Sequence, residues 1–261
     1  MSADMDTHSP ALTVEGVVAG YGKMTILNGT TAKVRAGAIT TVIGPNGAGK
    51  STLFKTIFGL LPVRSGTIKL GERDITNHSP RNILDAGVVY IPQGRNIFPE
   101  LSVRHNLELG GVALSEQANL SQRIDALMAQ FPMLREKADT QASTLSGGQQ
   151  KLLEVARGML LDPKLVLIDE PSIGLSPLMV QEVFSILKAL RDKGVTILLI
   201  EQNAKMALQM SDYGLVLEQG QTRIEDAAPS ILADARIAQL FLGGGLAPAA
   251  SASGSLTGIL A

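Results

Sequence analysis

The chain alternates short apolar runs with longer segments in which apolar residues recur at helical spacing. Strand-like runs occupy residues 38–43, 165–168, 197–200, 215–217 and 221–224, and all but the last of them are mainly apolar. The last two runs flank Gln219-Gly220, a pair that favours a tight turn, so they are expected to form a hairpin. Because these runs alternate with helical patterns, the sequence predicts an α/β fold with a mostly parallel sheet.

Two segments have the pattern of amphipathic helices. One begins at Ser176-Pro177, because serine is a favourable N-cap and proline suits the first helical position, and it ends at Gly194. Its apolar stripe is formed by Val180, Val183, Phe184, Leu187 and Leu190. The other runs from about Ser121 to just before Pro132, and its buried face would hold Ile124, Leu127, Met128 and Phe131.

The two ends of the chain lack this periodicity. Residues 1–10 are polar, and the sequence from residue 243 reads GGGLAPAASASGSLTGILA, a stretch of small residues. We therefore expect a flexible N-terminus over 1–10, a folded domain over 11–243 and a flexible tail over 244–261.

Composition excludes several classes of function. Hydrophobic residues make up 45% of the chain, which favours a globular protein. The 23 basic and 24 acidic residues leave a net charge of −1 without a basic stripe, which argues against nucleic acid as a partner. The chain has no cysteine, so thiolate catalysis and cysteine-ligated metals are excluded. The histidines are scattered, at His8, His78 and His105, and do not suggest a metal site.

The chain also shows no pattern of a membrane span or leader. The apolar run over 195–200 is much shorter than the about 20 residues that a bilayer requires. The first residues, MSADMDTHSP, are polar and acidic. A soluble, cytoplasmic protein is expected.

The most specific motif is GPNGAGKS at residues 44–51, which matches the phosphate-loop pattern G-x-x-x-x-G-K-[ST]. It follows a predicted strand and precedes an apolar helical segment. Its glycines let backbone N–H groups surround a polyphosphate, and the helix N-terminus adds positive potential. We expect Lys50 to reach the β- and γ-phosphates and the Ser51 hydroxyl to bind Mg²⁺.

A second motif, LVLIDE at residues 165–170, is an apolar run that ends in adjacent carboxylates. In a parallel sheet, this places Asp169 beside the phosphate loop. Asp169 could then hold Mg²⁺ through water, and Glu170 could polarise a water molecule toward the γ-phosphate. Without the phosphate loop the pair would be weak, since such pairs often only end a strand in solvent.

A third motif, LSGGQ at residues 145–149, opens a helical segment. A serine and two glycines at a helix start can form an anion-binding N-terminus, although a simply capped helix with a flexible entry is the alternative. Because the chain already has one phosphate cradle, a second implies a site that faces another molecule.

Together these motifs resemble those of an ATP-binding-cassette (ABC) transporter ATPase subunit, over about residues 11–243. The resemblance implies a P-loop NTPase core, an antiparallel β subdomain and a helical signature subdomain at about residues 94–158. It also implies ATP and Mg²⁺ as cofactors. Two such subunits would bind two ATP molecules at one head-to-tail dimer interface.

The resemblance assigns further roles residue by residue. Tyr21 resembles the aromatic residue that stacks on adenine. Gln93 resembles the glutamine that touches Mg²⁺ and the attacking water, and it begins the subdomain that contacts the membrane permease. The expected nucleotide contacts are Tyr21, Gly44, Asn46, Gly47, Ala48, Gly49, Lys50, Ser51, Thr52, Gln93, Ser146, Gly147, Gly148 and Gln149. The expected metal contacts are Ser51, Gln93 and Asp169, and the expected catalytic residues are Lys50, Glu170 and Gln202.

Two positions depart from the general family pattern. Ser176 replaces the usual aspartate in the loop after the catalytic glutamate, and it also suits the helix N-cap. Gln202 replaces the usual switch histidine near the γ-phosphate. Glutamine can hydrogen-bond a phosphate oxygen but cannot become cationic, so the hydrolysis rate at this site is left open.

A narrower resemblance concerns the transported solute. The segments IPQGRNIFPELSVRHNLELGG, DEPSIGLSP and LLIEQNA and the FLGG ending resemble an ATPase of importers for leucine, isoleucine and valine. Related systems import urea or amides. The resemblance implies a second ABC ATPase, integral permease subunits, a periplasmic or extracellular solute-binding protein, and a location at the cytoplasmic face of the cell membrane.

Three alternatives belong to other classes. A soluble cassette protein acting on nucleic acid or ribosomes would usually carry two cassettes or a long coiled-coil insertion. A phosphate-loop kinase would leave residues 145–149 unexplained. A nucleotide-gated binding module with little hydrolysis is suggested only by Gln202.

Overall fold

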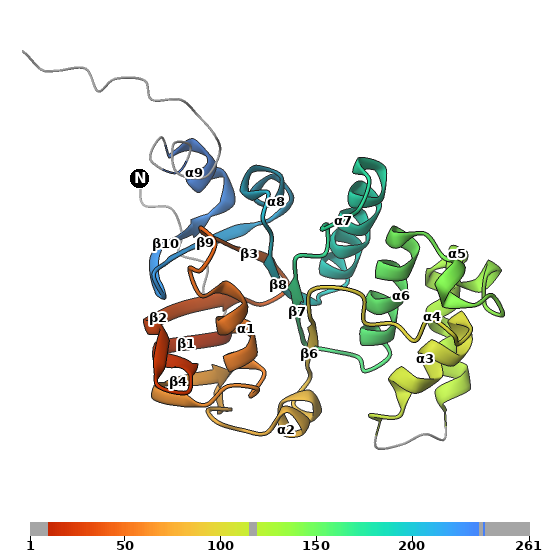
Figure 1. The fold of residues 1–261 in the computed structure, drawn as a ribbon, viewed down its shortest axis with the longest axis horizontal. Helices are drawn as coiled ribbons and strands as arrows, with labels where there is room; N and C mark the ends of the chain where they lie inside the picture. The colour runs from red at the N-terminus through yellow and green to blue at the C-terminus, as the bar shows by residue number, and fades with distance from the viewer. Residues whose placement is uncertain (1–9, 115–118, 235–236, 238–261) are drawn as a thin grey trace, which may run out of the picture.

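The computed structural model describes residues 10–114, 119–234 and 237, and within them the strands form two sheets (Figure 1). The expected flexible ends over 1–9 and 244–261, the FLGG ending and the last part of the folded domain lie outside the described residues. No helix of the described part is long and apolar enough to cross a membrane.

The larger sheet has six strands in the order β10-β9-β3-β8-β7-β6. They are β3 (Ile39–Ile43), β6 (Val88–Ile91), β7 (Leu165–Asp169), β8 (Thr196–Ile200), β9 (Tyr213–Glu218) and β10 (Gln221–Ala227). Every neighbouring pair is parallel except β9 and β10, which form the predicted hairpin around Gln219-Gly220. The mostly parallel sheet expected from the sequence is therefore confirmed.

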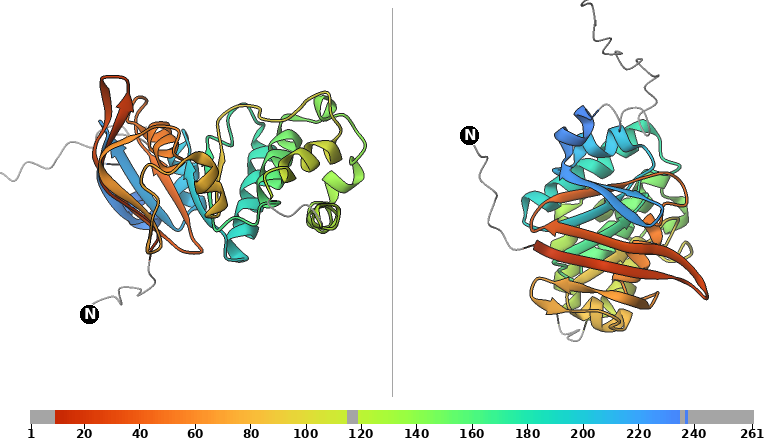
Figure 2. Two further views of the ribbon diagram at one scale, coloured as in Figure 1. Left: turned by 90° about the horizontal axis from the view of Figure 1, so that it is seen from below. Right: turned by 90° about the vertical axis from the view of Figure 1, so that its left-hand side faces the viewer.

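The smaller sheet is antiparallel, with the order β2-β1-β4-β5. Its strands are β1 (Pro10–Tyr21), β2 (Met24–Arg35), β4 (Val63–Leu70) and β5 (Arg73–Asp74). Figure 2 shows this sheet as the outer layer at one end of the molecule. It is the antiparallel β part that the family resemblance implied.

The parallel strands are mostly apolar because both faces of their sheet are covered. On β7, Leu165 and Leu167 face one hydrophobic cluster, whereas Val166 and Ile168 face another. The first cluster encloses α1 (Lys50–Ile57), which lies between the two sheets. The second is covered by α7 (Pro177–Asp192). This alternation with period two explains why the sequence shows continuous apolar runs.

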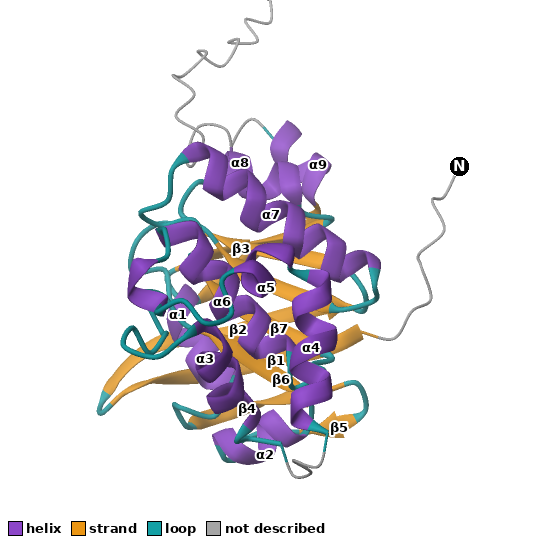
Figure 3. Cartoon of the chain, turned by 90° about the vertical axis from the view of Figure 1, so that its right-hand side faces the viewer, coloured by secondary structure: helices purple, strands orange, loops and turns teal. Residues whose placement is uncertain are grey.

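A separate group of helices packs around its own hydrophobic cluster, as Figure 3 shows in front of the sheets. It comprises α3 (Val103–Gly111), α4 (Leu120–Gln130), α5 (Pro132–Glu136) and α6 (Gly147–Met159). Phe131 is buried but caps α4 rather than belonging to it, because Pro132 starts the next helix. The remaining helices are α2 (Pro80–Asp85), α8 (Ala204–Met210) and α9 (Ala228–Ala233).

The predicted start of α7 is confirmed. Ser176 is its N-cap, and the serine side chain accepts a hydrogen bond of 3.5 Å from the Met179 N–H. Pro177 occupies the first helical position. The serine that departs from the family pattern therefore has a local structural role.

Candidate functional site

The candidate site is built where neighbouring parallel strands end at one edge of the larger sheet. The strand β3 leads into the phosphate loop, β6 into Gln93, β7 into Asp169 and Glu170, and β8 into Glu201 and Gln202. Parallel pairing of β6 with β7, β7 with β8 and β8 with β3 sets these strand ends side by side. Segments more than 100 residues apart in sequence thus converge.

The phosphate loop requires glycine at two positions. A Cβ at Gly44 would lie 2.1 Å from the Leu217 carbonyl oxygen. Gly49 has a φ of 102°, a left-handed conformation that disfavours other residues, and it caps α1. The Gly220 N–H donates a 2.9 Å hydrogen bond to the Ala48 carbonyl, so the β9–β10 turn supports the loop from outside.

Lys50 lies across this loop. Its Nζ donates to the carbonyl oxygens of Gly44, at 2.8 Å, and Pro45, at 3.1 Å. Burial lowers the pKa of Lys50, while the nearby Glu170 and Asp169 carboxylates oppose that effect. The Lys50 ammonium group therefore interacts both with the loop carbonyls and with the two carboxylates, and a bound phosphate would add a further negative charge beside it.

Asp169 is almost completely buried at the end of β7, with 2% exposure. Its Oδ2 accepts a 3.4 Å hydrogen bond from the Tyr90 hydroxyl, and its Oδ1 has no hydrogen-bond partner. Burial raises the pKa of Asp169, and the hydroxyls of Ser51 and Tyr90 act in the opposite direction. A buried carboxylate oxygen without a donor is suited to a cation.

Glu170 adopts a φ of 47°, a rare conformation for a residue with a side chain. Its N–H donates to the Ile200 carbonyl at 2.9 Å, which anchors the backbone at the sheet edge. Its Oε2 accepts a 2.8 Å hydrogen bond from Gln93 Nε2. The structure thus brings together the phosphate loop, Gln93, Asp169 and Glu170, as the sequence predicts.

Electrostatics gives a pH prediction for Glu170. Burial and the neighbouring Asp169 raise the pKa of Glu170, while Lys50 lowers it. If Glu170 polarises the attacking water, as the sequence predicts, its carboxylate must be ionised, so ATP turnover is expected to fall on acidification at a higher pH than the ordinary glutamate pKa of about 4.3 would give. A kcat profile against pH, with ATP saturating at each point, measures this limb. A limb centred at or below that ordinary value would contradict the expectation.

Glu201 was not among the residues predicted from the sequence. Its buried carboxylate accepts hydrogen bonds from the Ser172 N–H at 2.9 Å, the Ser172 hydroxyl at 2.7 Å and the Gln202 N–H at 3.2 Å. It ties the loop after Glu170 to the end of β8, while the Gln202 side chain is exposed beside it. A carboxylate that directly follows an apolar strand at this edge was the available signal.

Residues 146–149 of the LSGGQ motif, called the signature from here on, cap α6. The Ser146 hydroxyl accepts from the Gln149 N–H at 3.3 Å, and the Gln149 side chain accepts from the Ser146 N–H at 3.1 Å. This capping box uses the serine oxygen as an acceptor. Gly147 and Gly148 occupy the first turn, whose N–H groups have no acceptor within the helix.

The signature lies apart from the phosphate loop of its own chain. Figure 1 places α1 and α6 on opposite sides of β6 and β7. Tyr21, by contrast, is close to α1: its hydroxyl accepts a 3.5 Å hydrogen bond from Lys55 Nζ, and the residue is 45% exposed. Asn46 and Gly47 are exposed in the phosphate loop, and Thr52 is buried in α1.

Comparison with known proteins decides the family. Residues 27–173, from β2 to the loop after Glu170, match the family model described as ABC transporter. The chain belongs to the ABC transporter ATPase family. This ABC ATPase binds and hydrolyses ATP, which is the activity of the domain it contains. Its P-loop NTPase fold is likewise that of solved cassettes.

Several relatives cover nearly the whole of this ABC ATPase. The high-affinity branched-chain amino acid transport ATP-binding protein BraG of Pseudomonas aeruginosa is 36% identical, over 89% of this chain and 100% of that protein. The lipopolysaccharide export system ATP-binding protein LptB of Escherichia coli is 30% identical, over 89% and 97%. The crystal structure of a nucleotide-free ATP-binding cassette has a TM-score of 0.81 at 29% identity, covering 90% of this chain and all of that one.

Proposed function

We propose that this ABC ATPase energises an importer for branched-chain or other hydrophobic amino acids. The proposal is supported by the relatives whose names state branched-chain amino acid transport, BraG and the probable LivF of Archaeoglobus fulgidus, the latter 37% identical over 86% of this chain. Partners of this function would be a second ABC ATPase, integral permease subunits and a solute-binding protein. The chain would act at the cytoplasmic face of the membrane.

The separation of the signature from the phosphate loop carries the mechanism. One chain offers a phosphate cradle at one place and an anion-binding helix start at another. A second subunit would supply the missing half of each site in a head-to-tail dimer. ATP would then draw the two subunits together, and loss of the γ-phosphate would release them.

The residues at the sheet edge would divide the work in hydrolysis. Lys50 would bind the β- and γ-phosphates, Glu170 would accept a hydrogen bond from the attacking water, and Gln93 would help to hold that water. Tyr21 would stack on adenine. Nearly all of this catalysis is positioning and electrostatic stabilisation, which fits groups fixed on strand ends.

The donor set fits Mg²⁺, which prefers oxygen ligands and usually takes few of them from the protein. The unpartnered Oδ1 of Asp169 and the adjacent Ser51 hydroxyl are such donors, and Gln93 could contribute its amide oxygen. When bound, the ion neutralises charge on the β- and γ-phosphate oxygens.

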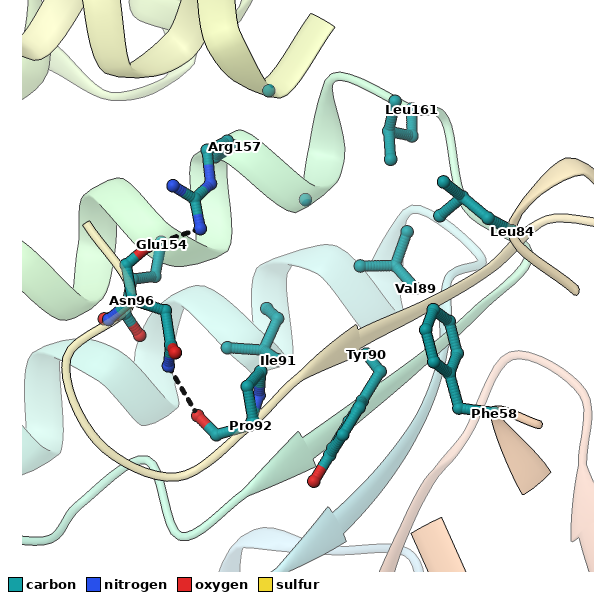
Figure 4. A pocket seen from close by; sticks show the side chains of 12 residues that line it. Phe58, Leu84, Val89, Tyr90, Ile91, Pro92, Asn96, Glu154, Arg157 and Leu161 are labelled. Atoms are coloured by element: carbon teal, nitrogen blue, oxygen red, sulfur yellow. Dashed lines mark hydrogen bonds between the residues drawn. The ribbon is translucent and has the colours of Figure 1, made fainter. Parts of the chain in front are cut away.

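The permease would dock beside the loop that follows Gln93, over residues 94–106. A cavity of about 150 Å³ opens there, lined by Phe58, Leu84, Tyr90, Arg157 and others (Figure 4). Large apolar side chains are exposed at Leu60, Phe98 and Leu109. Such a hollow with apolar surroundings suits a short segment of a membrane subunit.

Gln202 gives a prediction about turnover. We expect Gln202→Ala to lower kcat about threefold to tenfold with ATP affinity nearly unchanged, because the amide would act on charge that develops in the transition state. Gln209→Ala, at an exposed position on α8, is the matched control. Steady-state ATPase assays measure kcat, and nucleotide titration measures ATP affinity. An unchanged kcat would show that Gln202 does not contribute to hydrolysis.

Transport assays test the solute. We expect a strain deleted for this chain to lose uptake of labelled leucine, isoleucine and valine, and to regain it with the wild type but not with Glu170→Gln. Rescue of labelled urea or acetamide uptake instead would favour the alternative importer class. A defect in lipid export alone would favour the role named for LptB.

A further inference from the structure

The helix that begins at the signature carries buried charges on its inner face. Lys151, Glu154 and Arg157 recur at every third position of α6 and so share one side of it. The side chains of Lys151 and Glu154 are 7% and 2% exposed, and their Nζ and Oε2 atoms are 2.5 Å apart. A buried ion pair is costly to desolvate, and it is retained only where further hydrogen bonds satisfy both groups.

Those further bonds all go to the loop that follows Gln93. Lys151 Nζ donates to the Gly94 carbonyl at 3.0 Å, and Glu154 Oε1 accepts from the Asn96 N–H at 2.5 Å. The Arg157 guanidinium donates to the Asn96 carbonyl, as Figure 4 shows. We call Lys151, Glu154 and Arg157 the α6 clamp. It binds the backbone of the loop on both sides of residue 95.

Apolar packing holds this loop from Ile97 onward, where Ile97 lies against the helical cluster, but not over residues 93–95. Residues 93–95 are exposed, so no core fixes them. A cavity of about 150 Å³ lies on the Asn96 and Arg157 side of the clamp, and another of about 240 Å³ lies on the Gly94 and Lys151 side. With space on both flanks, the part of the loop between Gln93 and Ile97 is held by the polar bonds of the clamp to Gly94 and Asn96.

The loop bears directly on the reaction site. Gln93 is adjacent to Gly94, and its Nε2 donates to Glu170 Oε2 at 2.8 Å. Asn96 Nδ2 also donates to the Pro92 carbonyl at 3.1 Å, so the residues on both sides of Gln93 are tied to the clamped segment. A shift of α6 would therefore move the Gln93 backbone.

We propose that the α6 clamp positions Gln93 against Glu170 and so makes α6 a rigid link from the signature to the hydrolysis site. This inference rests on the proposed function, because it takes Gln93 to act in hydrolysis. Lys151, Glu154 and Arg157 are positioning residues, because their bonds go to the backbone of the loop and they act through it. When the dimer closes on the signature, a movement of the signature would be transmitted to Gln93 through α6.

A double-mutant cycle tests the clamp. The release variant, Lys151→Met with Glu154→Leu, removes both buried charges together and keeps apolar volume, so neither charge is left unpaired. It is combined with Gln93→Ala in the full-length chain within its purified transporter complex. The control is Arg81→Met with Asp85→Asn, which removes an exposed ion pair on α2.

We expect the release variant to lower kcat about fivefold to tenfold, with the ATP dissociation constant within about twofold of wild type. In the Gln93→Ala background it is expected to cause no further loss, because the clamp acts through Gln93. The control pair leaves kcat unchanged. If the release variant does not fold, Arg157→Met removes the bond to Asn96 together with the contacts of the guanidinium with Phe98 and Glu154, and it should show the same dependence on Gln93 with a smaller loss.

If the release variant lowers kcat equally in the wild-type and Gln93→Ala backgrounds, or in neither, the proposed role of the clamp is wrong. In that event a reduced kcat for Gln93→Ala alone would leave the proposed function standing. If Gln93→Ala alone left kcat unchanged, the role proposed for Gln93 in hydrolysis would be wrong, and so would the role proposed for the clamp.

Discussion

Glu170→Gln is expected to reduce ATP turnover by about a hundredfold to a thousandfold while ATP still binds. The substitution keeps the shape of the side chain and its place beside Gln93, but an amide cannot accept a proton from water or hold it as a carboxylate does. The phosphate loop is untouched, so affinity for ATP should change little. The loss is therefore expected almost entirely in kcat.

The same variant should accumulate an ATP-dependent dimer. If hydrolysis releases the two subunits, a slow enzyme with bound ATP stays closed, alone or with its natural partner. Size-exclusion chromatography with and without Mg²⁺-ATP measures this, and Glu182→Gln, an exposed carboxylate on α7, is the control. If the variant stays monomeric in the presence of ATP, both alone and with its natural partner subunit, the sandwich dimer is contradicted.

Lys50→Ala is expected to weaken ATP binding about a hundredfold or more. Its ammonium group is buried in the phosphate loop, where charge-assisted hydrogen bonds to phosphate are strong, and each 1.4 kcal/mol lost is about tenfold in affinity. Titration with a fluorescent ATP analogue measures the dissociation constant. The control is Lys193→Ala, an exposed lysine just before β8 and hence at the opposite edge of the sheet. Full affinity in Lys50→Ala would show that the loop does not bind phosphate.

Much of the fold could be predicted because local signals agree with it. The strands β7 and β8 contain continuous apolar runs of four residues, since both faces of their sheet are covered, and Ser176-Pro177 marks the start of α7 through cap chemistry. Motif spacing likewise located the phosphate loop and the Asp169–Glu170 pair. These features depend on residues close together in the chain.

Other features depend on pairings that no local pattern contains. On α6, the lysine and glutamate at positions 151 and 154 have the spacing of an exposed helix pair, yet they are buried against a loop over 50 residues away. Glu201 directly follows an apolar strand, but its contact with Ser172, from which its role comes, cannot be deduced from that local pattern. The hydrogen bond from Tyr90 to Asp169 joins residues 79 positions apart. Such contacts follow from strand order, which the periodicity of single segments does not determine.

The measurement that tests the account most directly is the composition of the native complex. The chain would be tagged in its own host, extracted gently from membranes and purified, and its companions identified by mass spectrometry. We expect two integral permease subunits and a second ABC ATPase, together with a solute-binding protein that binds leucine, isoleucine or valine. Ribosomal or DNA-associated companions without a permease would contradict the importer, while leaving the ATPase itself in place.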